Sequence, residues 1–236
     1  MDWSGYDAAL FDLDGVVTPT AEVHMRAWDV MFNGFLGDHE GQPPYTEADY
    51  FSYVDGKPRY DGVASFLESR GITLPHGDPA DLPDRETVCG LGNRKNDAFR
   101  QVLRDEGVQP YAGSVRLLDA LRERGVPMAI VSSSRNAPEV LAAAGVASYF
   151  PVVMDGRVAS ERGLAGKPAP DTFLAAAADL GADPAASVVL EDALSGVAAG
   201  RAGAFGLVVG VDRGVGAAAL TDAGADVVVD DLEGLL

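Results

Sequence analysis

Short apolar runs alternate with amphipathic segments through most of the chain. Six of these runs predict β-strands: Ala8–Phe11, Met128–Ser132, Val152–Met154, Val188–Leu190, Leu207–Val211 and Val227–Val229. Segments with helical periodicity lie between them: Val115–Arg124, Ala137–Ala144, Thr172–Leu180 and Leu194–Ala202. Each segment is followed by a glycine, as is common at helix C-termini: Gly125, Gly145, Gly181 and Gly203. Because strands and helices alternate, the pattern predicts an α/β fold built on a parallel sheet.

One region interrupts this alternation. After the first predicted strand, about ninety residues pass without a convincing second strand, far more than an ordinary connection to a helix. The region instead predicts helices at Ala21–Leu36, Thr46–Tyr53, Gly62–Arg70 and Asn93–Asp105, and an exposed loop at Pro75–Asp84. We therefore expect a core formed by residues 1–18 and 109–236, with a helical cap domain of residues 19–108 inserted after the first strand.

The composition is that of a globular protein. The chain has 236 residues, of which 47% are hydrophobic and 23% are charged, enough for a core domain and a smaller companion. No apolar run reaches the roughly 18 residues of a membrane span, and the N-terminus lacks the basic stretch of a signal peptide. The single cysteine, Cys89, allows no internal disulfide and indicates an inert thiol in a reducing compartment. We expect a cytoplasmic monomer with no membrane partner.

The net charge of −18 narrows the class of ligand. A surface this acidic repels the phosphate backbone of nucleic acids, which argues against a nucleic-acid partner. A small phosphorylated substrate would meet the same repulsion. It would therefore need a local cluster of hydrogen-bond donors and a bound cation.

Two aspartates follow the first predicted strand in the segment FDLDGV. Asp12 and Asp14 are two residues apart, so an extended backbone turns both carboxylates to the same side. They lie at the carboxyl end of a buried strand, where open α/β sheets bind ligands, and Gly15 then allows a sharp turn. Two carboxylates this close favour a bound cation such as magnesium. On its own, however, the pair also fits a solvated strand end.

Three further segments carry the same kind of chemistry. Ser132 ends the second predicted strand, and Lys167 precedes a predicted helix that begins after two prolines. Glu191 and Asp192 end the fourth predicted strand and add oxygen ligands for a hard cation. A serine hydroxyl and a lysine ammonium can bind the oxygens of a phosphoryl group. Taken singly, Ser132 also fits a turn and Lys167 a solvated surface.

Together these four segments resemble the haloacid dehalogenase superfamily over essentially the whole chain. The resemblance implies a Rossmann-like parallel-sheet core in which Asp12 attacks phosphorus to form an aspartyl-phosphate and Asp14 is the general acid and base. It implies that Ser132 and Lys167 bind the phosphoryl group in transfer. It also implies one Mg²⁺ held by four residues: Asp12, Asp14 through its backbone carbonyl, Glu191 and Asp192. Dehalogenases and phosphonate hydrolases lack the second aspartate, which sets those activities aside.

A finer resemblance is to the β-phosphoglucomutase family. The segment FDLDGVVTPTAEVHMRAW is similar to the N-terminal signature of that family, including Thr20, His24, Arg26 and Trp28. The resemblance implies seven substrate-binding residues: Thr20, His24, Arg59, Lys95, Ser134, Arg135 and Asn136. Of these, Arg59 and the 134–136 loop would hold the phosphate that does not react, and His24 would gate Asp14. Two local alternatives stay open: Arg59 and Lys95 also fit surface charges, and His24 also fits a helix histidine with a local partner.

Other features of the predicted cap bear on its packing and movement. Trp28, Phe32 and Phe35 share one helical face and are predicted to pack inside the cap rather than to bind a sugar. Pro19 stands where the family usually has an acidic residue, and it should stiffen the hinge. The Pro75–Asp84 loop is longer than the resemblance implies.

The function implied is that of a β-phosphoglucomutase. Such an enzyme interconverts β-glucose 1-phosphate and glucose 6-phosphate through β-glucose 1,6-bisphosphate, which also serves as the activating phosphoryl donor. Two cationic clamps, one at Lys167 and one around Arg59 and Arg135, suit a substrate with two phosphates. The alternatives are a sugar-phosphate phosphatase with the same aspartyl-phosphate chemistry, and a phosphosugar-binding module without catalysis.

Overall fold

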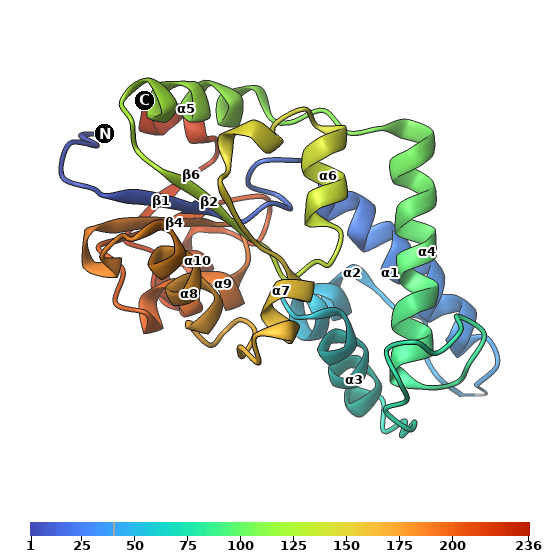
Figure 1. Ribbon diagram of the computed structural model, residues 1–236. Coiled ribbons are helices and arrows are strands. Elements are labelled where there is room, and N and C mark those ends of the chain that lie inside the picture. Colours follow the sequence, from blue (N-terminus) through green and yellow to red (C-terminus); the bar gives the residue numbers. More distant parts are fainter. Residues whose placement is uncertain (40) are drawn as a thin grey trace. The chain divides into compact units, whose positions relative to one another are not determined.

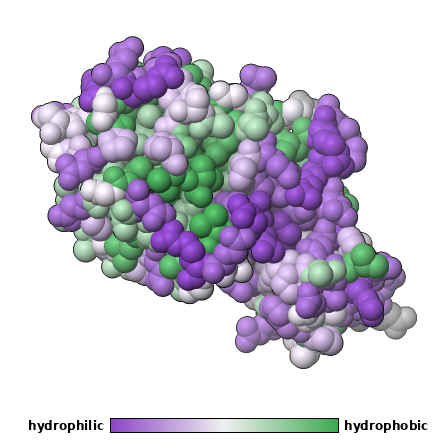
Figure 2. All heavy atoms as spheres, viewed as in Figure 1, coloured by the Kyte–Doolittle hydropathy of each residue, from purple (hydrophilic) through white to green (hydrophobic). Residues whose placement is uncertain are grey.

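Two compact units make up the chain in the computed structural model, which describes residues 1–39 and 41–236. The core unit contains Met1–Thr20 and Val108–Leu236, and the helical unit contains Ala21–Gly107. No helix within the described ranges is long and apolar enough to cross a lipid bilayer. Figure 2 shows one face of the molecule, on which hydrophilic side chains surround several apolar patches.

The core unit is built on a six-stranded sheet in the order β3-β2-β1-β4-β5-β6 (Figure 1). Its strands are β1 (Ala8–Phe11), β2 (Met128–Val131), β3 (Val152–Met154), β4 (Ser187–Glu191), β5 (Leu207–Val211) and β6 (Val227–Val229). Every neighbouring pair is parallel. All six predicted strands are therefore confirmed. Only two differ from the predicted bounds: β2 ends one residue earlier, and β4 is one residue longer at each end.

Helices cover both faces of this sheet, which explains why its strands read as continuous apolar runs. Figure 1 shows α8 (Asp171–Leu180), α9 (Leu194–Ala202) and α10 (Ala217–Ala223) on one face and α5 (Ala112–Glu123) on the other. Residues of β1, β2 and β4 that face α8 and α9 form one buried cluster with Phe173 and Val197. The central strands β1 and β2 are buried along their whole length. This burial fixes the strand ends that carry the predicted site.

Two short helices of the core unit were not predicted: α7 (Gly156–Glu161) and α10. Neither segment is long enough for its apolar residues to show a helical period. The first depends on a cap, because Asp155 Oδ1 accepts hydrogen bonds from the backbone N–H groups of Arg157 and Val158. The second, in an alanine-rich segment, buries only Leu220. Short helices of this kind are set by capping and tertiary contacts.

The remaining helices of the core unit are α6 (Ala137–Ala143) and three single 3₁₀ turns at Ala147–Tyr149, Pro184–Ala186 and Leu232–Leu235. Gly203 ends α9 as predicted, but its φ of −78° is ordinary, and the left-handed position falls on Ala204, with φ of 54°. Gly203 is needed for another reason, since a Cβ there would lie 2.7 Å from the ring of Phe205.

The helical unit contains α1 (Thr20–Leu36), whose first residue belongs to the core unit, α2 (Glu47–Asp49), a π-helical turn (Tyr50–Val54), α3 (Arg59–Ser69) and α4 (Val88–Glu106). Aromatic side chains form its core: Phe32 lies 4.1 Å from Phe66 and 5.3 Å from Trp28, between ring centroids. Trp28 and Phe35 are both buried in this cluster. The predicted packing role of these aromatic residues is confirmed.

Two helices of this unit begin three or more residues earlier than predicted. Thr87 caps α4 by accepting a hydrogen bond from the Gly90 N–H, so the helix begins at Val88. Pro58 precedes α3, which makes Arg59 the first residue of that helix. The Pro75–Asp84 segment contains no helix or strand and is largely exposed, as predicted. Asp81 stabilises this loop by accepting hydrogen bonds from the Thr87 hydroxyl and the Asp78 N–H.

Candidate active site

The predicted residues of the core unit meet at the carboxyl edge of its sheet. Asp12 follows β1, Ser132 follows β2 and Glu191 ends β4. In the observed strand order, connections run in opposite directions from β1 and β4, and open α/β sheets bind ligands at such a switch point. The loop before α8 brings Lys167 to the same place, where its Nζ lies 2.6 Å from Asp12 Oδ1. The structure thus joins side chains that are far apart in sequence.

Lys167 is the central cation of this cluster. Its buried ammonium donates hydrogen bonds to Asp12 Oδ1, to the Val131 carbonyl at 3.0 Å, and to Glu191 Oε1. Burial opposes a charge on the amine, but the adjacent carboxylates of Asp12 and Glu191 raise the pKa of Lys167 above its ordinary value. The side chain therefore carries a positive charge fixed beside Asp12.

Burial has the opposite consequence for Asp12. It raises the pKa of the Asp12 carboxyl well above its ordinary value; Lys167 lowers it, and the charges of Glu191 and Asp14 raise it further. A carboxyl group must be ionised to act as a nucleophile. A further cation beside Asp12 would favour that ionised form.

Asp14 is held by hydroxyl groups of the core unit. Thr20 Oγ1 donates a hydrogen bond to Asp14 Oδ1, and Ser132 Oγ donates to Asp14 Oδ2 at 3.4 Å. Thr20 is itself within 2.7 Å of the Thr18 hydroxyl. The substrate-binding role expected of Thr20 stays a prediction, and the structure adds a contact that orients the candidate acid–base residue.

The donor set of this cluster fits a magnesium ion. Carboxylate oxygens of Asp12, Glu191 and Asp192 lie within 4.8 Å of one another. Hard divalent cations prefer such oxygen ligands, and the Lys167 ammonium contacts two of these three carboxylates, those of Asp12 and Glu191. Both oxygens of Glu191 accept hydrogen bonds, from Lys167 and from the Ala193 N–H, so Asp12 and Asp192 are the better placed as direct ligands. Asp192 comes so close to the loop after β1 that a Cβ on Gly15 would lie 1.8 Å from its Oδ2.

The predicted phosphate-binding loop lies directly after Ser132. The Ser134 N–H donates to Ser132 Oγ at 3.1 Å, and the Asn136 N–H donates to Ser134 Oγ at 3.1 Å. Gly156 supports the loop from the end of β3, because its N–H donates to the Ser134 carbonyl and a Cβ there would lie 2.5 Å from Ser133 O. Arg135 and Asn136 are therefore presented on the same loop as Ser132.

The helical unit places its predicted residues in two clusters. In one, Arg59 donates from Nη2 to Asn96 Oδ1 at 2.6 Å and from Nη1 to Asn93 Oδ1 at 3.4 Å. In the other, Lys95 Nζ contacts His24 Nδ1. Both residues of this second cluster belong to the helical unit, so the predicted contact of His24 with Asp14 stays a prediction.

Lys95 is buried, which contradicts the alternative of an ordinary surface charge. Its Nζ lies 4.9 Å from the ring centroid of Trp28 and 5.2 Å from that of Phe99, while His24 stacks on Phe99 at 4.0 Å. An ammonium group can only donate, so His24 Nδ1 must accept. We therefore assign His24 as the neutral tautomer with its proton on Nε2.

Arg213 is a residue of this edge that the sequence analysis missed. It follows β5, donates from Nε to the Gly15 carbonyl at 2.7 Å, and lies 3.9 Å above the ring of Tyr111. Its position after a predicted strand was the signal available, because the carboxyl ends of parallel strands share one edge. Arg213 supports the loop that carries Asp14.

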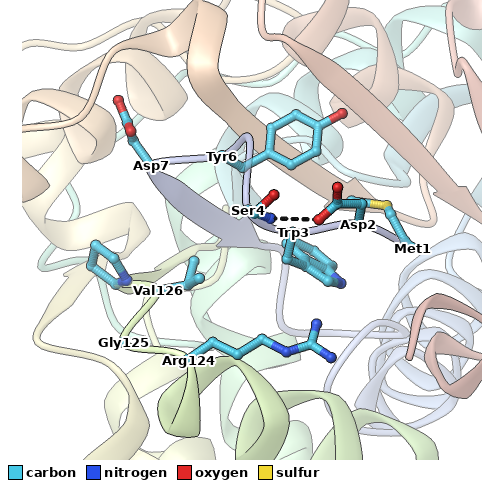
Figure 3. A pocket seen from close by; sticks show the side chains of 10 residues that line it. Met1, Asp2, Trp3, Ser4, Tyr6, Asp7, Arg124, Gly125 and Val126 are labelled. Carbon is cyan, nitrogen blue, oxygen red and sulfur yellow. Dashed lines mark hydrogen bonds between the residues drawn. The ribbon is translucent and has the colours of Figure 1, made fainter.

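A cavity of about 590 Å³ lies elsewhere in the core unit (Figure 3). It is lined by the N-terminal segment, including Trp3 and Tyr6, and by residues 124–127. These segments precede β1 and β2, so the cavity is at the amino edge of the sheet, opposite Asp12. None of the predicted site residues lines it.

Known proteins resemble this chain over most of its length. Residues 6–203 match the family described as haloacid dehalogenase-like hydrolase. A protein named β-phosphoglucomutase from Mycobacterium bovis is 51% identical over 97% of this chain and 91% of its own length. The β-phosphoglucomutase of Bacillus subtilis is 31% identical over 86% of this chain and 83% of its own. The crystal structure of β-phosphoglucomutase from Clostridium difficile shares the fold, with a TM-score of 0.79 and 24% identity over 98% of this chain and 93% of that one. This chain belongs to the haloacid dehalogenase-like hydrolases and, among them, to the β-phosphoglucomutase family.

Proposed function

We propose that this protein is a β-phosphoglucomutase that interconverts β-glucose 1-phosphate and glucose 6-phosphate through β-glucose 1,6-bisphosphate. The observation that carries the proposal is the 51% identity to the M. bovis protein of that name over nearly the whole chain. The buried Asp12–Lys167 pair, with the charge of Asp14 acting on Asp12, supplies the chemistry that such a reaction requires. The physiological setting is the cytoplasm, and the protein acts as a monomer on a small sugar phosphate.

Asp12 is the nucleophile in this proposal. Its carboxylate attacks a phosphorus atom of the bisphosphate, so that a new bond to Asp12 forms as the bond to the sugar oxygen breaks. Asp14 donates a proton to the departing oxygen, and in the reverse direction it removes the proton from the sugar hydroxyl. The hydrogen bond from Thr20 holds Asp14 in the orientation for this transfer, which leaves the Ser132 hydroxyl proton for the phosphoryl group.

Lys167 and Ser132 act on the group in transfer. The fixed ammonium of Lys167 balances negative charge on the phosphoryl oxygens, and the Ser132 hydroxyl donates a hydrogen bond to one of them. A magnesium ion held by Asp12 and Asp192, with the Asp14 carbonyl and Glu191 completing the site, would neutralise further negative charge on the phosphoryl group. The local cations overcome the repulsion expected from a chain of net charge −18.

The second phosphate is bound by a separate set of residues. From the core unit these are Ser134, Arg135 and Asn136, and from the helical unit Arg59. Lys95 contacts the substrate, and His24 gates Asp14. The helical unit acts as a cap that excludes water, so that the phosphoryl group returns from Asp12 to sugar. The bisphosphate also serves as the activating donor that first phosphorylates Asp12.

A primed assay tests this function. The purified protein would receive either anomer of glucose 1-phosphate with Mg²⁺ and catalytic β-glucose 1,6-bisphosphate, while glucose 6-phosphate and inorganic phosphate are measured in parallel. We expect glucose 6-phosphate from the β anomer and little free phosphate. Phosphate release without glucose 6-phosphate would assign the protein as a sugar-phosphate phosphatase instead.

A further inference from the structure

Arg59 is anchored by two side-chain amides of one helix. Asn93 and Asn96 are three residues apart on α4, so their side chains share a face, and each points its oxygen at one arm of the guanidinium. Gly92 allows α3 to come this close, since a Cβ there would lie 2.8 Å from the ring of Tyr60 and 3.1 Å from Arg59 Cδ. The arginine is therefore presented in a fixed orientation.

The Pro75–Asp84 loop fixes one of these amides. Asn93 Nδ2 donates to the carbonyls of Pro79 and Asp81 at 3.1 and 2.9 Å, which uses both of its N–H groups. With the nitrogen held by the loop, the oxygen must face Arg59, where it also accepts a hydrogen bond from the Tyr60 hydroxyl at 3.0 Å. The long loop thus determines the orientation of the group that anchors the arginine.

Both amide oxygens accept from Arg59 without adding negative charge. Elsewhere the chain anchors arginines with carboxylates, as in the Arg70–Asp49 and Arg162–Asp179 pairs at 2.8 and 2.6 Å. A carboxylate would offset the charge of the guanidinium and repel a bound anion, whereas an amide does neither. With 36 acidic and 18 basic side chains in the sequence, carboxylates are the commoner charged partners available.

We propose that Asn93 and Asn96 are positioning residues that aim Arg59 at the non-reacting phosphate of a sugar bisphosphate and add no negative charge of their own beside it. This inference rests on the proposed function, which assigns that phosphate to Arg59. The loop of residues 75–84 also helps to position Arg59, because Asn93 donates hydrogen bonds to the carbonyls of Pro79 and Asp81 in that loop.

The sharpest test replaces Asn96 by aspartate and, separately, by alanine. Asn96→Asp keeps the acceptor for Arg59, so the melting temperature should be retained, but the added charge should weaken β-glucose 1,6-bisphosphate binding by roughly tenfold or more. Asn96→Ala removes the anchor without adding charge and should weaken binding less. Calorimetry in an Asp12→Asn background measures this affinity without turnover, and steady-state assays of the same substitutions with Asp12 intact should show KM rising more than kcat falls.

Two further variants complete the test. Gln101→Glu makes the same amide-to-carboxylate change at an exposed position of α4, and it should leave affinity and KM unchanged. Asn93→Ala should speed amide hydrogen exchange in residues 78–82 and weaken bisphosphate binding. Bisphosphate affinity unaltered by Asn96→Asp, or lowered equally by Gln101→Glu, would overturn the inference. If the wild type binds the bisphosphate but forms no glucose 6-phosphate, the proposed function is wrong. The roles of Asn93 and Asn96 are still tested in that case, because the bisphosphate affinities of the variants can be compared with that of the wild type.

Discussion

Each unit of this protein buries a lysine, and the two lysines have different surroundings. Lys167 of the core unit lies between the carboxylates of Asp12 and Glu191. Lys95 of the helical unit contacts the imidazole of His24 and lies over the rings of Trp28 and Phe99. The chain has only three lysines in all, so two of the three are buried. Buried lysines are rare unless they are paired, which makes the difference in partners informative.

The partners determine what each lysine can do. Lys167 is paired with acids, so removing it would leave buried negative charge, and its ammonium is directly beside the candidate nucleophile. Lys95 donates to a neutral ring, so it sets the tautomer of His24 and removing it leaves no uncompensated carboxylate in that contact. We therefore expect substitutions around Lys167 to affect both chemistry and stability, and those around Lys95 to have milder effects.

The largest effect should come from Asp12→Asn. An amide cannot form the aspartyl-phosphate, so kcat should fall by at least about 10⁴-fold, the scale expected on losing a covalent nucleophile. Circular dichroism and calorimetry with a sugar phosphate should show that fold and binding are largely preserved. The matched control is Asp222→Asn, which makes the same change at an exposed position of α10. Full turnover by Asp12→Asn would mean that another residue is the nucleophile.

Lys167→Met should be the next most damaging change. Loss of a charge that stabilises the transferring group should lower kcat by about 10²–10³-fold. Because Asp12 and Glu191 would lose their buried partner, the free energy of unfolding should fall by about 3–5 kcal/mol. Lys57→Met is the control, since the half-buried Lys57 ammonium donates a hydrogen bond to the Ser65 hydroxyl at 2.7 Å, a neutral acceptor. Urea denaturation measures the loss, and equal stability of the two variants would contradict a buried ion pair at Lys167.

Magnesium should distinguish the two lysine environments. If Asp12 and Asp192 hold the ion, saturating Mg²⁺ at about 100 times its Kd should stabilise the fold by about 2.7 kcal/mol. Asp192→Ala should remove most of this increment, while Lys95→Met should leave it unchanged, as measured by melting temperature with and without EDTA. A Mg²⁺ increment that survives Asp192→Ala would place the ion elsewhere.

Sequence patterns predicted the core unit well because the central strands β1, β2 and β4 are fully buried. That burial produces continuous apolar runs, and parallel strands bring their carboxyl ends to one edge, so Asp12, Ser132 and Glu191 were expected to meet there. The short helices α7 and α10 escaped detection because a cap and a single buried leucine define them. The local sequence pattern predicts helices and strands that are long or fully buried. It misses short helices that depend on a few contacts.

The surroundings of particular side chains were less predictable. Nothing local to Lys95 shows that it is buried, because its partner His24 is 71 residues away on another helix. Likewise, the contacts of Asn93 with Pro79 and Asp81 depend on how the loop folds back along α4. Residue type and spacing identified the cationic side chains of Lys95 and Arg59. The groups that contact these side chains lie on other segments of the chain, so local sequence does not reveal them.

The smallest of these effects is expected for Lys95→Met, which tests the helical-unit half of the comparison. Methionine can still pack against Trp28 and Phe99. Losing the hydrogen bond from the charged Lys95 donor to His24 should cost about 1.5–3 kcal/mol, below the loss for Lys167→Met. Nitrogen chemical shifts of the His24 ring should show an Nε2–H tautomer in the wild type and a mixture of tautomers in the variant. A wild-type His24 protonated on Nδ1 would rule out the donor–acceptor assignment. If Lys95→Met instead destabilised the fold as much as Lys167→Met, a neutral ring could not be its main partner, and the contrast between the two lysines would be lost.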